Sequence, residues 1–168
     1  MSGLDIVVMG LGNVLLGDDG LGVYAVRTLE ENYSHPWIAY YDGGTHGLDL
    51  LPLMEEGSHL LMLDSIKGTG TPGSIVEITE ENLSFSIPLK FSTHDIALPD
   101  LLALLRLRRG EALKKILILG MISGPLAISD ELSPGLQDSF PEFIHRATEV
   151  LQQWLGSKQA TAENSLCA

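Results

Sequence analysis

Short apolar runs and segments of helical spacing alternate along most of the chain. Each run has about five residues, is rich in aliphatic side chains and ends at glycine or a polar residue, which is typical of buried strands. The runs cover residues 5–9, 38–41, 59–63, 74–78 and 115–119. Apolar residues then recur at i, i+3, i+4 and i+7 over residues 21–29, 95–108 and 133–155, which predicts helices. Thr45 is placed to cap a further helix over 45–56, although Pro52 interrupts it.

This order of elements predicts an α/β protein. A mostly parallel, twisted, five-stranded sheet would lie between helices on both faces as a three-layer α/β/α sandwich. The short link after the third strand favours antiparallel pairing of the fourth strand at an edge of the sheet. We expect a single domain over residues 1–156 and a flexible C-terminal tail over 157–168. Ligands of such sheets bind at the carboxyl ends of the strands.

Length, charge and cysteine usage exclude several classes of protein. The chain has 168 residues, which suits one domain that needs no disulfide to bury a core. Its formal charge of −12 repels phosphate backbones, so no nucleic acid partner is expected. The single cysteine, Cys167, provides neither a disulfide framework nor a thiolate zinc cage. No apolar run has the roughly 18 residues of a membrane span and no secretory signal is visible, so we expect a cytoplasmic protein.

Three side chains with metal-binding chemistry lie at the predicted carboxyl edge of the sheet. Asp19 follows the first strand, Asp64 ends the third, and His94 lies in the loop entering the helix at 95–108. Two carboxylates and an imidazole form a three-ligand set for a divalent metal such as nickel or zinc, with positions left open for water or substrate. Taken singly, each residue is better explained as a cap of a helix or strand end. The shared edge is what favours a metal site.

Other ligand and enzyme classes fit the sequence less well. The glycine-rich segment 10–22 lacks the third glycine of a dinucleotide-binding fingerprint, because Leu15 stands there. The adjacent acids Asp18 and Asp19 would also repel a pyrophosphate at the helix entry. The chain has no G-x-S-x-G, H-E-x-x-H or P-loop signature, and Ile66 stands where an aspartic protease has glycine. Nucleotide binding therefore ranks below metal binding.

Four segments together resemble the hydrogenase-maturation endopeptidase family. They are GLGNVLLGDDGLG at 10–22, DGGTHG at 42–47, LLMLDSI around Asp64 and STHDIALPDLL around His94. The resemblance spans residues 5–155. Members of this family are proteases that remove a C-terminal extension from the large-subunit precursor of nickel-iron hydrogenase after nickel insertion. The resemblance implies the same metal-dependent reaction and the same partner for this chain.

The resemblance also implies roles for individual residues. The family's two acidic metal ligands and its histidine fall on Asp19, Asp64 and His94, which would form the catalytic metal site. The family's DGGTxG motif, associated with substrate selection, falls on Asp42, Gly43, Gly44, Thr45 and Gly47. We expect nickel supplied by the substrate, with zinc or cadmium as surrogates. Two alternatives stay open: a non-catalytic nickel-checking assembly factor, and a small-molecule or nucleotide-binding α/β protein.

Overall fold

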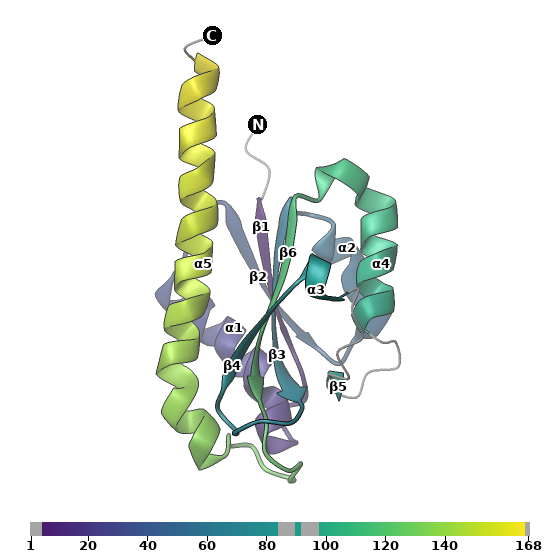
Figure 1. Cartoon of the computed structure of the whole chain (residues 1–168), viewed down its shortest axis with the longest axis vertical. Coiled ribbons are helices and arrows are strands. Elements are labelled where there is room, and N and C mark those ends of the chain that lie inside the picture. The colour runs from purple at the N-terminus through teal and green to yellow at the C-terminus, as the bar shows by residue number, and fades with distance from the viewer. Residues whose placement is uncertain (1–4, 84–89, 92–97, 167–168) are drawn as a thin grey trace.

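A twisted sheet forms the middle layer of the molecule. The computed structural model describes residues 5–83, 90–91 and 98–166 (Figure 1). The sheet has the strand order β2-β1-β3-β6-β4. Its parallel strands are β1 (Ile6–Leu11), β2 (Ile38–Gly44), β3 (His59–Lys67) and β6 (Lys115–Ile122). The other two are antiparallel to their neighbours: β4 (Ile75–Thr79) pairs with β6, and the two-residue β5 (Lys90–Phe91) pairs with β3.

Helices cover both faces of this sheet. One face carries α1 (Leu21–Asn32) and α5 (Pro134–Leu166), and the opposite face carries α2 (Leu51–Met54) and α4 (Leu98–Arg109). The short elements are η1 (Gly17–Gly20), η2 (Gly47–Leu50), α3 (Glu80–Leu83) and η3 (Gly110–Ala112). The predicted three-layer α/β/α sandwich around a mostly parallel sheet is confirmed (Figure 1).

The central strands are apolar on both faces, as buried parallel strands require. In β1, Ile6 and Val8 pack toward α1 and α5, whereas Val7 and Met9 pack toward α2 and α4. This alternation divides the buried side chains into two cores, one on each face. Among the described residues, no helix is long and apolar enough to cross a membrane.

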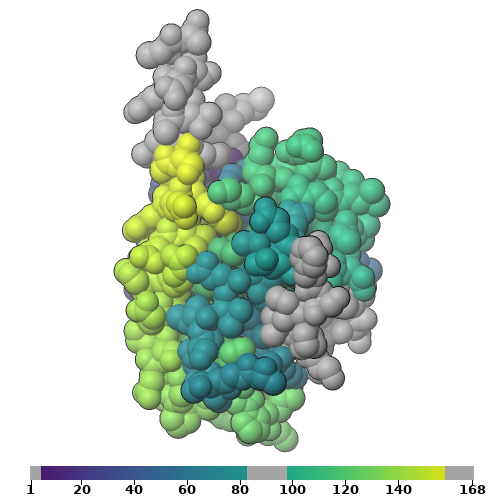
Figure 2. Space-filling view, in the orientation of Figure 1, coloured from purple at the N-terminus to yellow at the C-terminus, as the bar shows by residue number. Residues whose placement is uncertain are grey.

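The fourth strand lies at an edge and is antiparallel, as predicted, but its neighbour is not the third strand. Strand β3 has a parallel partner on each side, β1 and β6. Strand β4 therefore pairs with the other side of β6, at the edge of the sheet. In the space-filling view, β4 lies at the surface beside α5 (Figure 2). The prediction that the fourth strand pairs with the third was wrong. The longer, apolar strand β6 pairs with β3 in its place.

The segment after the second strand forms two short elements instead of one helix over 45–56. The 3-10 turn η2 is followed by the four-residue α2, and no side chain caps either element. Thr45 is exposed and precedes η2, so its expected role as a cap is wrong. Pro52 falls in the first turn of α2, where a missing N–H breaks no helical hydrogen bond.

Two elements extend further than the sequence predicted. Strand β3 continues to Lys67 because β6 pairs with it as far as Ile66, so Asp64 and Ser65 lie inside the strand and not in a loop. Helix α5 continues through Gly156 to Leu166, so residues 157–166 are helical where a frayed tail was expected. The residues after Gly156 include alanine, lysine, glutamine and glutamate, which favour helix strongly enough to offset about 1 kcal/mol for one glycine.

Candidate active site

The first turn of α1 packs directly on the backbone of β1 and β3 near the point where their pairing ends. A Cβ at Gly22 would lie 2.0 Å from the carbonyl oxygen of Leu63, and one at Gly10 would lie 2.1 Å from the carbonyl oxygen of Gly22. Only glycine permits this approach. The contact fixes η1, which immediately precedes α1, beside the point where β3 reaches Asp64.

Asp19 lies within η1 and is only 2% exposed. Its Oδ2 atom accepts a hydrogen bond of 2.9 Å from the backbone N–H of Asn13. Its Oδ1 atom is buried, and no donor in the described part of the chain reaches it. A buried carboxylate oxygen without a donor is costly, so this atom is a candidate for a bound cation.

Asp64 is fully buried within β3. Its Oδ1 atom accepts the N–H of the next residue, Ser65, at 2.8 Å. By strand alternation its side chain shares the face of Met62 and Ile66, which α2 and α4 cover. Asp64 pairs with Gly120 of β6 but lies one residue past the last partner of β1. Asp64 therefore lies where β1 no longer flanks β3, next to the start of α1.

Asp18 has a structural role that the sequence did not reveal. Its Oδ1 atom accepts the N–H of Ser133 at 2.7 Å, and its Oδ2 atom accepts the Ser133 hydroxyl and the N–H of Gly124, each at 2.9 Å. These bonds hold the start of α5 and the loop after β6 against η1. Both partners are more than a hundred positions away in sequence, so no local pattern could have separated Asp18 from Asp19.

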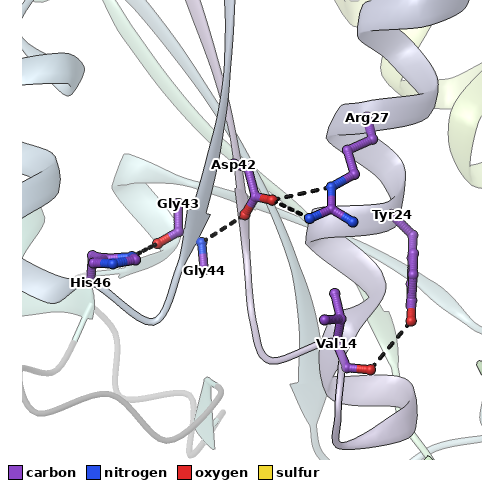
Figure 3. A network of polar contacts seen from close by, with 7 residues as sticks. All are labelled: Val14, Tyr24, Arg27, Asp42, Gly43, Gly44 and His46. Carbon is purple, nitrogen blue, oxygen red and sulfur yellow. Dashed lines mark hydrogen bonds and ion pairs between the residues drawn. The ribbon is translucent and has the colours of Figure 1, made fainter. Parts of the chain in front are cut away.

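The DGGTHG segment forms the end of β2 and the turn that follows it (Figure 3). Asp42 Oδ2 accepts hydrogen bonds from Arg27 Nε and Nη2 at 3.1 and 2.7 Å, and Oδ1 accepts the N–H of Gly44 at 3.2 Å. Gly44 has φ of +48°, which favours glycine. The His46 ring packs back on the carbonyl of Gly43 at 3.1 Å. Both oxygens of Asp42 thus accept hydrogen bonds from protein donors. Sequence reasoning did not identify Arg27 as a partner of this segment.

The structure brings two of the three predicted metal ligands to one edge. Asp19 and Asp64 both lie at the carboxyl edge, and His94 lies outside the described residues. No group of three or more histidine, cysteine, aspartate or glutamate side chains within the described ranges is arranged to hold a metal ion. The metal site with His94 therefore stays a prediction. The fold itself defines a three-layer α/β protein with buried acids at the carboxyl edge of its sheet.

Comparison with known proteins assigns the chain to one family. A family model described as HycI, hydrogenase maturation protease, matches residues 23–154. The Hydrogenase 2 maturation protease of Escherichia coli K12 is 32% identical over 150 residues, covering 88% of this chain and 91% of that protein. The hydrogenase expression/formation protein HupD of Rhodobacter capsulatus is 31% identical over 168 residues, covering 96% of this chain and 79% of that protein.

Solved structures agree with this assignment. The hydrogenase maturating endopeptidase HybD from E. coli superposes with a TM-score of 0.78 at 32% identity, covering 89% of this chain and 93% of that one. The HybD protease from Thermococcus kodakarensis shares the fold, with a TM-score of 0.72 at 23% identity, covering 87% and 98%. The chain therefore belongs to the hydrogenase maturation protease family, and it is an endopeptidase.

Proposed function

We propose that this protease removes the C-terminal extension of a nickel-iron hydrogenase large-subunit precursor after nickel insertion. In this proposal Asp19, Asp64 and His94 bind the nickel that the precursor carries, so the metal arrives with the substrate. Zinc or cadmium would serve as surrogates. The reaction would take place in the cytoplasm. A chain with one cysteine cannot form an internal disulfide, so an oxidising compartment would not stabilise it.

The buried Oδ1 atom of Asp19 is the observation that carries this proposal. Asp19 keeps one oxygen on the Asn13 N–H, while the other has no donor within the described residues. Hard oxygen and imidazole donors suit a divalent cation, and a cation would offset the cost of burying this oxygen. An acid that served only as a helix cap would use its oxygens on backbone N–H groups, as Asp18 does.

The direction of α4 supports a place for His94 in the same site. The far end of α4 lies at the amino edge of the sheet, where Arg109 donates to the carbonyl of Gly57 at 3.3 Å. The helix therefore begins at Leu98 toward the carboxyl edge, on the face of the sheet that Asp64 shares. In this proposal His94, four positions before Leu98 in the sequence, joins the site from this end of α4.

Exposed aliphatic residues beside the site favour a protein substrate. Leu15, Leu126 and Ile128 are 64%, 52% and 93% exposed. The loops that carry them are joined, because Ser129 donates its N–H to the carbonyl of Leu15 at 3.2 Å. Large exposed apolar side chains next to a site are typical of surfaces that bind other proteins.

Two chemical routes are open to this set of ligands. Substrate nickel held by Asp19, Asp64 and His94 would polarise the scissile carbonyl as a Lewis acid, or would lower the pKa of an attacking water. In both routes an attacking water would give a proton to a carboxylate oxygen that does not bind the metal, and this proton would pass to the leaving amine as the peptide bond breaks. Cleavage then depends on nickel having been inserted first.

The test is to mix the purified protein with nickel-loaded and with nickel-free large-subunit precursor and to analyse both by intact mass spectrometry. We expect a C-terminal fragment only from the nickel-loaded precursor, at catalytic enzyme concentrations. Equal cleavage of both forms would contradict nickel gating. Stable binding of the nickel-loaded precursor without a fragment would support a non-catalytic nickel-checking factor instead.

A further inference from the structure

Arg27 lies in the middle of α1, away from both buried ligand candidates, yet it contacts the DGGTHG turn directly. Two of its nitrogens donate to a single oxygen of Asp42, which leaves the other oxygen free to accept the N–H of Gly44 (Figure 3). The side chains of Arg27 and Asp42 are 54% and 38% exposed, so the pair lies at the surface. One carboxylate thus links the helix to the turn.

The turn needs such a link because its backbone conformation is unusual. Gly44 adopts a left-handed conformation, and the pairing between β1 and β2 shifts register at this point. The turn contacts β1 through the paired strands and through a further bond, in which Gly12 donates its N–H to the carbonyl of Gly44 at 2.9 Å. The Asp42 carboxylate attaches the same turn to α1, because it accepts two hydrogen bonds from Arg27.

The same side of α1 also holds the neighbouring loops. Tyr24, three positions before Arg27, donates its hydroxyl to the carbonyl of Asp130 at 2.6 Å and lies 3.3 Å from that of Val14. Residues three apart lie on one helix face. Tyr24 therefore fixes the loops after β1 and β6, whereas Arg27 fixes the turn after β2. Figure 3 shows the contacts of Tyr24 with Val14 and of Arg27 with Asp42.

We propose that Arg27 is a positioning residue of this protease, which orients Asp42 so that the Gly43–Gly44 backbone is held in the conformation that receives the precursor. The inference rests on the proposed function, since it takes the DGGTHG turn as the part that selects the substrate. Arg27 acts through Asp42 and touches neither metal nor scissile bond. Its loss should weaken substrate binding and leave the chemical step in place.

The test uses Arg27→Ala, Arg27→Lys, Asp42→Asn and the double variant of Arg27→Ala with Asp42→Asn. With nickel-loaded precursor, we expect Arg27→Ala to raise KM about fivefold and to leave kcat within about twofold, as suits an exposed ion pair. Arg27→Lys should restore part of the loss, because lysine keeps the charge but not the two-nitrogen contact. Asparagine still accepts the Gly44 N–H, so Asp42→Asn removes the Arg27 contact and spares the turn bond.

A readout independent of cleavage separates this inference from the proposed function. Amide hydrogen exchange at Gly44 should accelerate in Arg27→Ala and in Asp42→Asn, and the double variant should exchange no faster than either one. Two controls should leave Gly44 unchanged: Tyr24→Phe, on the same helix face, and Arg146→Ala, which removes another surface ion pair, with Glu77. Unchanged Gly44 exchange and unchanged KM in Arg27→Ala would overturn the inference, as would losses that multiply in the double variant. If the wild type fails to cleave the precursor, the proposed function fails, and the exchange data still decide whether Arg27 holds the turn.

Discussion

At the amino edge of the sheet, glutamates pair with arginines at the surface, whereas at the carboxyl edge three aspartates are buried and held by backbone N–H groups. Glu80 binds Arg106 and Glu55 binds Arg108, and these side chains remain partly exposed. Asp18, Asp19 and Asp64 are at most 4% exposed and accept bonds from backbone N–H groups. Exposed pairs cost little to form, but buried carboxylates lose their hydration. The carboxyl edge therefore accepts an energetic cost that the amino edge avoids, which is typical of a functional site.

The largest effect should come from changing the close backbone contact at the carboxyl edge. Gly22→Ala places a methyl group 2.0 Å from the carbonyl oxygen of Leu63, and backbone on both sides cannot yield as a side chain would. We expect a loss of about 3 kcal/mol or more in unfolding free energy, or no soluble protein. Urea unfolding followed by circular dichroism measures it.

Gly156→Ala is the matched control for that change. Gly156 lies inside α5, and nothing is within 4 Å of a Cβ built there. We expect it to stabilise the protein by up to about 1 kcal/mol, as glycine to alanine does in a helix. Similar destabilisation by both substitutions would mean that the contact with Leu63 is not what constrains Gly22.

Asp18→Ala should have the next largest effect on stability. It leaves the N–H groups of Gly124 and Ser133 and the Ser133 hydroxyl without their acceptor, at a cost of about 2 to 3 kcal/mol. Glu80→Ala, which removes an exposed partner of Arg106, should cost within about 1 kcal/mol. The same urea titration measures both, and equal costs would remove the contrast between the two edges.

A smaller effect should appear in the pH dependence of the unfolding free energy, through a histidine at the amino edge. Burial, followed by the nearby charges of Lys115 and Lys114, lowers the pKa of His59, which begins β3 and packs on Trp154. A lowered pKa means that neutral His59 stabilises the fold above its ordinary pKa of 6.5, and this contribution is lost as pH falls through the folded-state value. Between pH 7.5 and 5, the wild type should lose more unfolding free energy than His59→Gln. Identical pH profiles would show that His59 does not titrate with folding.

The smallest effect should come from truncation after Gly156. Figure 1 shows the end of α5 projecting beyond the amino edge of the sheet. Trp154 and Leu155 are the last buried side chains described on this helix. Removal of residues 157–168 should therefore leave precursor processing unchanged and shift the melting temperature by no more than about 2 to 4 °C. A larger fall would show that this part of α5 contributes to the folded body.

Local pattern was sufficient for the fold and for most element positions. The runs at 5–9, 59–63 and 115–119 became β1, β3 and β6, because continuous apolar residues are buried wherever parallel strands pair on both sides. The partner of β4 and the split of the segment 45–56 depend on contacts between distant parts of the chain. The spacing of apolar residues along the chain cannot predict these contacts.

The candidate site was predictable in part. Its position followed from topology, since Asp19 follows β1 and Asp64 lies in β3 just past the last residue that pairs with β1. The different roles of Asp18 and Asp19 did not, because they depend on which acid faces Gly124 and Ser133. The role of Arg27 was not predicted for the same reason, since its partner Asp42 lies on another element. The sequence also did not reveal that Asp19 lies in a buried 3-10 turn.

The most direct test of the central claim is the rate at which Asp19→Asn releases the C-terminal fragment from nickel-loaded precursor. Asparagine can still accept the N–H of Asn13 but gives a cation a much weaker donor. We expect processing to fall by about a hundredfold with nearly unchanged melting temperature, whereas Asp19→Glu, which keeps the charge, retains measurable activity. If Asp19→Asn processes the precursor at the wild-type rate, Asp19 is a helix cap and its assignment as a metal ligand is wrong.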